Sequence, residues 1–260
     1  MLEPRLAAWL DSYRTDLKSA LGRAAADQYR WVEANFAGEE LDPRRFDASA
    51  RRHLKRYLRD LGLSLDGLVL ELPGRGLADP ACADARLDRF RRGLEMCAHL
   101  GVRRAGVTLS GFQDDRSQPL ACELLDVVAD LADRVGVQVA VHTGTEPPQA
   151  AAEAIRRLDC PSLRLDLDTA HLLPAGPDVA SWAGLAGAAW VRDLRRVGAR
   201  VEEVPFGTGE VDFGAFLKLL DAADFSGPLV VRRDSPGAGV DALREGREYI
   251  EALAARAGSG

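Results

Sequence analysis

The side chains that could carry chemistry in this sequence stand at the ends of short apolar runs. His142 ends the run Val137–His142, Asp168 ends the run Leu163–Asp168, and His171 follows Asp168 after two residues. Imidazole titrates closest to physiological pH, so the two histidines are candidate proton carriers. Asp168 is a carboxylate that could orient one of them. The three residues therefore predict acid–base chemistry if the fold brings them together.

Five further candidates lie at or near the ends of other apolar runs. Arg232 ends the run Pro228–Arg232, and its guanidinium keeps its charge at neutral pH. Arg192 offers the same chemistry, so both arginines are candidates for binding an anion or a ligand oxygen. Trp190 could form an apolar wall of a ligand pocket. Two carboxylates complete the ligand-binding candidates, and they are Glu71 and Asp193.

A structural role is the alternative for several charged residues. Arg164, Asp166 and Asp168 alternate along one run and therefore share one side of a strand. A buried network of paired charges that needs no ligand would use these residue types. Glu33 is expected to hydrogen-bond inside the fold in the same way.

The candidates need a scaffold that sets successive strand ends side by side. Short β-branched or apolar runs alternate with longer stretches of helical period, which indicates parallel strands covered by helices. The expected strands are Leu6–Leu10, Tyr29–Ala34, Gly67–Leu72, Arg104–Leu109, Val137–His142, Leu163–Asp168, Ala188–Asp193 and Pro228–Arg232. The clearest helices are Ser49–Leu61, Arg86–Leu100, Leu120–Val135, Pro148–Leu158, Phe213–Ala223 and Asp241–Ala255.

Eight strand–helix units in 260 residues predict one closed (β/α)8 TIM barrel. The barrel is expected to cover residues 1–257, and residues 258–260 are expected to form a flexible tail. Gly62, Gly101 and Gly136 mark three expected helix ends, and Asp212 is an expected helix N-cap. In such barrels the active site lies at the carboxyl ends of the strands, where the candidates above fall.

Composition limits the class of protein. A hydrophobic fraction of 47% is sufficient for one large core, and the formal net charge of −6 argues against a nucleic-acid partner. No run has the length of a membrane span or of a signal-peptide core. The cysteines lack Cys-x-x-Cys spacing, so we expect reduced thiols and a cytoplasmic location. They are Cys82, Cys97, Cys122 and Cys160.

Several segments, in this order, resemble the sugar phosphate isomerase/epimerase family of xylose isomerase-like TIM barrels. The resemblance covers nearly the whole chain. Its segments are Tyr29-Arg30-Trp31-Val32-Glu33, Leu165-Asp166-Leu167-Asp168-Thr169-Ala170-His171, Trp190-Val191-Arg192-Asp193, Pro205-Phe206-Gly207-Thr208-Gly209-Glu210-Val211-Asp212-Phe213 and Gly227-Pro228-Leu229-Val230-Val231-Arg232. The resemblance implies proton transfer next to the carbonyl group of a sugar.

The resemblance also implies a metal site, and this sequence departs from it. The family typically holds its metal with Glu, Asp, His and Glu at the ends of strands five to eight. Only Asp168 matches, while His142, Trp190 and Arg232 fall on the other three positions. The two missing glutamates are also the family's acid and base. The resemblance therefore predicts a divergent, metal-poor site.

Three hypotheses follow for this site. In the first, no cofactor is needed, because Arg232 pairs with Asp168 and takes over the positive charge of the metal; the same pair could instead be an internal salt bridge that fills an inactive site. In the second, His142, Asp168 and His171 hold a divalent ion such as manganese, zinc or magnesium. In the third, the barrel is a non-catalytic binding or assembly protein.

The expected ligand is a small sugar, sugar phosphate or related polyhydroxy carbonyl compound. If the protein is an enzyme, we expect an isomerase, an epimerase or a related lyase. The backbone of Gly207-Thr208-Gly209 could approach a phosphate, or it could form a tight turn. The sequence leaves open whether identical chains assemble into a homo-oligomer.

Overall fold

Eight parallel strands close into a barrel, as the sequence predicts. The computed structural model describes residues 5–171, 180–198 and 200–258, and the strands run around the barrel in the order β1-β10-β7-β6-β5-β4-β3-β2. Their bounds are β1 Arg5–Trp9, β2 Trp31–Asn35, β3 Ser64–Leu70, β4 Arg104–Thr108, β5 Gln138–His142, β6 Leu163–Asp168, β7 Ala186–Val191 and β10 Pro228–Val231. Each of the eight expected strands overlaps one of these.

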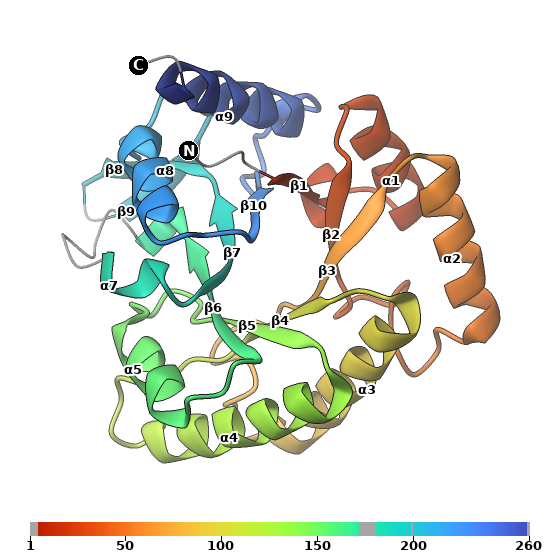
Figure 1. Ribbon diagram of the computed structural model, residues 1–260, viewed down its shortest axis with the longest axis vertical. Helices are drawn as coiled ribbons and strands as arrows, with labels where there is room; N and C mark the ends of the chain where they lie inside the picture. The colour runs from red at the N-terminus through yellow and green to blue at the C-terminus, as the bar shows by residue number, and fades with distance from the viewer. Residues whose placement is uncertain (1–4, 172–179, 199, 259–260) are drawn as a thin grey trace.

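Helices form the outer layer, around the strands (Figure 1). They are α1 Leu17–Ala26, α2 Ala48–Asp60, α3 Ala83–Leu100, α4 Gln118–Val135, α5 Gln149–Leu158, α7 Ala180–Ala183, α8 Phe213–Ala222 and α9 Ala242–Gly258. The six helices expected from the sequence are confirmed. The last one includes Gly258, where the sequence placed the start of a tail, while Ser259 and Gly260 lie outside the described residues.

The predicted helix ends have the expected geometry. Gly62, Gly101 and Gly136 adopt φ angles of 69°, 77° and 71°, in the left-handed region that favours glycine. The Asp212 side chain accepts a hydrogen bond of 2.9 Å from the backbone N–H of Ala215, so it caps α8. These local signals set where each helix returns the chain to the next strand.

The barrel divides its apolar residues into two cores. The larger core fills the space between strands and helices, and the Leu163, Leu165 and Leu167 side chains on β6 belong to it. The smaller core lies inside the barrel and consists of Ala7, Trp9, Val69, Trp190 and Val230, with Trp31 packed against it. Alternate residues of a strand face opposite sides. Charged residues of β6 therefore share the barrel interior with this small aromatic cluster.

A two-stranded hairpin interrupts the alternation of strands and helices, and the sequence did not predict it. It pairs β8 (Asp193–Val197) with β9 (Arg200–Val204) in antiparallel register, from Asp193 opposite Val204 to Val197 opposite Arg200. Most of its side chains are exposed, so no buried apolar face imposes the period of two that marks a strand in sequence. It follows β7 directly.

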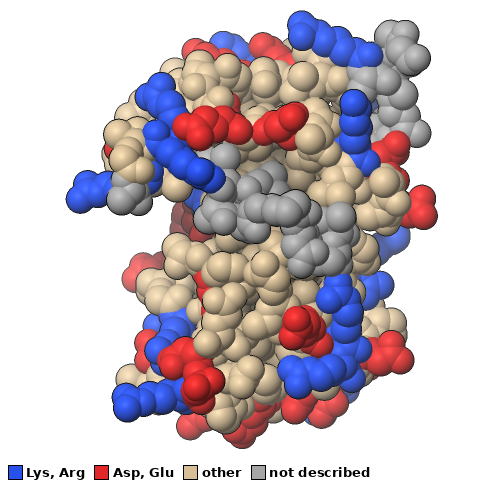
Figure 2. Space-filling model, turned by 90° about the vertical axis from the view of Figure 1, so that its left-hand side faces the viewer, with Lys and Arg blue, Asp and Glu red and all other residues tan. Residues whose placement is uncertain are grey.

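Two surface features bear on the expected partners. No helix in the described part of the chain is long and apolar enough to cross a membrane. On the face that Figure 2 presents, basic and acidic side chains are interspersed, and they do not gather into one basic surface.

Two glycine-to-alanine variants test the packing of the helical layer. A Cβ at Gly93 in α3 would lie 2.4 Å from two ring atoms of Phe36, whereas a Cβ at Gly22 in α1 would meet nothing within 4 Å. Gly93→Ala should lower the free energy of unfolding by about 1 to 2 kcal/mol, because overpacking outweighs the gain in helix propensity. Gly22→Ala, the matched control, should raise it by about 0.5 to 1 kcal/mol. Urea denaturation measures both, and changes of the same sign would contradict this packing.

Candidate active site at the carboxyl ends of the strands

Asp168 is fully engaged at the end of β6. Its carboxylate accepts two hydrogen bonds from Arg192, from Nε at 3.0 Å and from Nη2 at 2.5 Å, and a third from the backbone N–H of Ala170 at 2.8 Å. Burial alone would raise the pKa of Asp168, but the charge of Arg192 and the nearby His142 hold it well below its ordinary value. Asp168 is therefore a buried, ionised anchor for Arg192.

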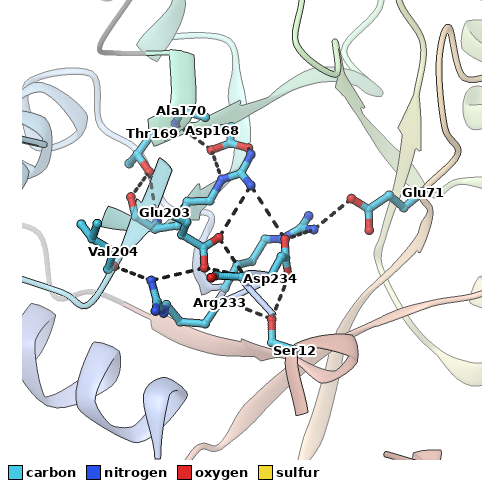
Figure 3. Close-up of polar contacts among 12 residues, drawn as sticks. Ser12, Glu71, Asp168, Thr169, Ala170, Glu203, Val204, Arg233 and Asp234 are labelled. Carbon is cyan, nitrogen blue, oxygen red and sulfur yellow. Dashed lines mark hydrogen bonds and ion pairs between the residues drawn. The ribbon is translucent and has the colours of Figure 1, made fainter. Parts of the chain in front are cut away.

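Arg232 has other partners than the one expected. Its Nη2 donates to Glu71 at 2.9 Å and to Asp234 at 2.6 Å, and its Nε donates to Asp234 at 3.0 Å. The predicted pairing of Arg232 with Asp168 is wrong, because β7 lies between β6 and β10 and the residue that follows β7, Arg192, reaches Asp168 first. Figure 3 shows Glu71, Asp168 and Asp234 in one network of polar contacts.

Two tryptophans support the Arg232 guanidinium. Its central carbon lies 3.9 Å from the ring centroid of Trp190 and 4.7 Å from that of Trp9, so the cation faces both aromatic rings. Trp190 is only 1% exposed, which leaves it no open face for a sugar and makes it the support of Arg232. Nη1 of Arg232 is buried and lacks a hydrogen-bond partner among the described residues.

His142 lies beneath this layer as a neutral ring. Its Nδ1 accepts a hydrogen bond of 3.2 Å from the backbone N–H of Gly144, which assigns the ring proton to Nε2. Nε2 is 3.4 Å from Asp168 Oδ2 without the alignment of a hydrogen bond. Burial lowers the pKa of His142 to about 4, and its ring packs 4.2 Å from that of Trp190. At neutral pH this imidazole is poorly suited to accept a proton from a ligand.

His171 keeps a free acceptor atom. Its Nε2 lies 2.8 Å from the carbonyl oxygen of Gly144, which can only accept, so Nε2 carries the ring proton. Nδ1 then presents a lone pair, and it has no partner within the described part of the chain. The ring stacks on His142 at a centroid distance of 5.7 Å. Of the two candidate histidines, His171 has the geometry of a base.

The sequence missed Glu203, which the hairpin brings to this end of the barrel. Its carboxylate accepts hydrogen bonds of 3.1 Å from the backbone N–H groups of Asp234 and Ser235, and it lies 3.3 Å from Nη1 of Arg233 and 3.9 Å from Nη1 of Arg192. Figure 3 shows Glu203 next to Arg233 and Asp234. Without the hairpin, no sequence signal connects Glu203 to this site.

Asp193 orders a loop. Its carboxylate accepts hydrogen bonds from the backbone N–H groups of Leu194, Gly207 and Gly209 at 2.8 to 2.9 Å. A Cβ at Gly209 would lie 2.1 Å from Asp193 Oδ1, so only glycine permits this approach. The backbone N–H groups of Gly207 and Gly209 donate to Asp193, so they are not available to a phosphate. Of the two roles expected for this segment, the structure supports the tight turn.

A second layer of charges lies deeper in the barrel. Glu33 accepts hydrogen bonds from Arg104 and from Nε1 of Trp190, the latter at 3.0 Å, as its expected structural role requires. Both carboxyl oxygens of Asp166 lack a hydrogen-bond partner among the described residues. Burial, and next the charge of Glu33, raise the pKa of Asp166 well above its ordinary value. Charged residues are therefore present both at the mouth of the barrel and in its interior.

The residues at the mouth do not suit a metal ion. Within the described ranges, no three His, Cys, Asp or Glu side chains are grouped so that they could hold one. Asp168 already binds a guanidinium with both oxygens, and Nε2 of His171 carries a proton that points to Gly144. In the set His142, Asp168 and His171, only Nδ1 of His171 thus keeps an unused lone pair, which is fewer ligands than a divalent ion needs.

The pairing of Asp168 with Arg192 can be tested by stability. Arg192→Gln should lower the free energy of unfolding by about 2 to 4 kcal/mol, because it leaves a buried carboxylate without its counter-charge. The double variant Arg192→Gln/Asp168→Asn should recover part of the loss. Arg195→Gln, on the exposed side of the hairpin, is the matched control. A single Arg192→Gln variant as stable as the wild type in urea would show that the pair contributes nothing.

The lowered pKa of His142 predicts a pH dependence. The unfolded chain binds a proton near the ordinary histidine pKa of 6.5, whereas burial lowers the pKa of His142 in the folded chain to about 4. His142 therefore contributes stability above pH 6.5 that is lost as the pH falls toward 4, by up to about 3 kcal/mol. In urea denaturation, the free energy of unfolding should decline less steeply between pH 7 and 4 in His142→Gln than in the wild type. His53→Gln, exposed on α2, should keep the wild-type decline; equal slopes in all three proteins would refute the prediction.

Solved structures share this barrel at low sequence identity. A xylose isomerase domain protein from Planctomyces limnophilus matches with a TM-score of 0.82 and 15% identity over 100% of both chains. A xylose isomerase-like TIM barrel protein from Mycobacterium smegmatis, solved in complex with magnesium, has a TM-score of 0.80 and 14% identity over 96% of each chain. A D-allulose 3-epimerase from Methylomonas sp. has a TM-score of 0.75 and 16% identity, over 96% of this chain and 98% of its own.

The family assignment rests on a separate comparison. No curated protein matches the sequence. The family described as xylose isomerase-like TIM barrel matches residues 21–253, which is most of the chain, and the resemblance seen in the sequence is thereby confirmed. This chain belongs to the xylose isomerase-like TIM barrel family.

Proposed function

We propose that this protein isomerises a small polyhydroxy carbonyl compound of the sugar class, without a metal ion, at the carboxyl ends of its strands. The observation that carries the proposal is the Arg232 guanidinium, buried against Trp190 and Trp9 and hydrogen-bonded to Glu71. The site thus holds a permanent positive charge next to a carboxylate. Enolisation of a hydroxy-carbonyl compound requires these two groups, a cation near the oxygen and a base near the carbon-bound proton.

Arg232 supplies the electrostatic part of this chemistry. Removing a proton next to a carbonyl group puts negative charge on the oxygen, and a fixed cation nearby stabilises that charge. The guanidinium side chain is 5% exposed, so its field is screened less than in water. Asp234 and Glu71 are 33% and 32% exposed at their side chains, which leaves them open to the hydroxyl groups of a ligand.

Glu71 is the proposed base. Isomerisation through an enediol moves a proton between adjacent carbons on one face, so a single carboxylate can remove it and return it. One oxygen of Glu71 accepts the hydrogen bond from Arg232, and the other is the one we assign to the carbon-bound proton. We assign to the Nδ1 lone pair of His171 the hydroxyl proton that must move between the two oxygens.

The second candidate function is binding without turnover. It is favoured by the pairing of Asp168, Asp234, Glu71 and Glu203 with arginines, because a paired carboxylate is a weaker base. The same residues would then recognise the hydroxyl groups of a sugar and leave its carbon-bound protons in place.

Solvent-exchange NMR separates the two candidates. The protein is incubated in D₂O with a panel of aldoses, ketoses and their phosphates, with and without EDTA. The proposal expects one compound to be interconverted, with deuterium incorporated next to its carbonyl group, at a rate that EDTA leaves unchanged. Glu71→Gln should lower kcat by about 100-fold or more, and Arg232→Gln should lower kcat/KM by about 100-fold. Glu123→Gln, exposed on α4, is the matched control.

Each other outcome has a defined meaning. A thermal shift by a sugar with neither turnover nor exchange would support the binding protein and contradict the isomerase. Activity lost in EDTA, or a stoichiometric transition metal in elemental analysis, would refute the metal-free site. No shift and no turnover across the panel would refute both candidates.

A further inference from the structure

A cavity opens at the amino ends of the strands, opposite the candidate active site. Its volume is about 710 Å³, and residues at the start of all eight barrel strands, or just before them, line it. Four arginines contribute to the lining, and they are Arg5, Arg103, Arg104 and Arg164. Asp66 is the acidic residue of this lining. Nothing in the proposed isomerisation uses this end of the barrel.

The charge of the cavity opposes that of the whole protein. Two of the four arginines of the lining are offset by Asp66 and by Glu33, which pairs with Arg104 from inside the barrel, and this leaves an excess of two positive charges in a chain whose formal net charge is −6. Asp66 is shared, since Arg5 lies 3.2 Å from one of its oxygens and Arg104 lies 3.0 Å from the other. Neither Arg103 nor Arg164 forms an ion pair with a carboxylate in the described part of the chain. The excess is therefore not neutralised locally.

Buried donors face no acceptor here. Arg104 is 4% exposed, and its Nε and Nη1 have no hydrogen-bond partner among residues 5–171, 180–198 and 200–258. Nε of Arg5 is also buried and has no hydrogen-bond partner among the described residues. An unpaired buried N–H group is costly, and more so when it is charged. Arg104 and Arg5 therefore keep donor groups that no acceptor among the described residues uses.

Two glycines let the arginines lie across the bottom of the barrel. A Cβ at Gly67 would lie 2.4 Å from Nη2 of Arg104, and a Cβ at Gly187 would lie 2.6 Å from Cβ of Arg164. The arginines therefore occupy space that larger residues at these two positions would fill. This packing fixes the Arg104 guanidinium and the first carbons of the Arg164 side chain against the strands.

We propose that this cavity binds a small molecule bearing two or more phosphoryl groups. Guanidinium groups match the geometry of phosphate oxygens and can bind them in pairs. An excess of two positive charges, on Arg103 and Arg164, suits a phosphorylated ligand better than a single carboxylate. The volume lies within the range of about 300 to 1,000 Å³ that small-molecule sites occupy, and it exceeds what one inorganic phosphate needs.

Calorimetric titration with pyrophosphate tests the site. Pyrophosphate should bind the wild type more tightly than phosphate does, and acetate should bind weakest. Arg103→Gln/Arg164→Gln should raise the Kd for pyrophosphate by about 10- to 100-fold, because charge-assisted hydrogen bonds are lost. Both side chains are at least partly exposed, so the variant should fold. Arg134→Gln/Arg157→Gln has the same change in charge outside the cavity and should change the Kd by about 2-fold or less.

A second measurement needs no variant. In the unchanged protein labelled with ¹⁵N-arginine, a small group of side-chain Nε resonances should shift on addition of pyrophosphate.

A separate control distinguishes this site from the proposed isomerase site. Arg232→Gln should bind pyrophosphate with the wild-type Kd, so a failure of the proposed isomerase would leave this result intact. No heat and no resonance shift at millimolar pyrophosphate would overturn the proposal. Equal Kd values for the two double variants, or acetate binding as tightly as pyrophosphate, would also overturn it.

Discussion

Arginine–carboxylate pairing inside a barrel that excludes water is the interaction on which this structure depends. Asp168 with Arg192 and Glu71 with Arg232 lie at the mouth, while Glu33 with Arg104 lies deeper. Removing one member of a buried pair leaves a charge without water or partner, which costs far more than the pair contributes. The arrangement also explains why so few lone pairs remain at the mouth for a metal ion. Four carboxylates there are already paired with arginines of the chain, and they are Glu71, Asp168, Glu203 and Asp234.

The aromatic cluster gives this pairing its geometry. Trp9 and Trp190 come from strands that flank β10, and they present their rings to the guanidinium that ends it. The cation is thereby fixed in depth and direction before any ligand arrives, which is the preorganisation that electrostatic catalysis needs. Trp190 in turn donates a hydrogen bond to Glu33. The mouth is therefore connected to the deeper charges by an indole ring, and changes in one layer reach the other.

Most of the fold could be predicted from the sequence, because periodicity and capping are local properties. The Gly62, Gly101 and Gly136 helix ends and the eight strands needed no knowledge of distant contacts. The hairpin could not be predicted, since its exposed strands carry no apolar period. The partners of Arg232 and Asp168 also escaped prediction, because both lie at strand ends and only the order of strands around the barrel decides which cation reaches which carboxylate. The types of residue at the strand ends were sufficient to locate the site. Which arginine pairs with which carboxylate depends on the order of the strands around the barrel.

The raised pKa of Asp166 changes how the charge of the molecule should be counted. A formal charge of −6 treats every aspartate as ionised. Wherever Asp166 keeps its proton, the folded protein is one unit less negative than that figure, and unfolding at the same pH releases a proton to the solvent. Migration in an electric field would then differ between native and denatured chains by more than their change in size explains.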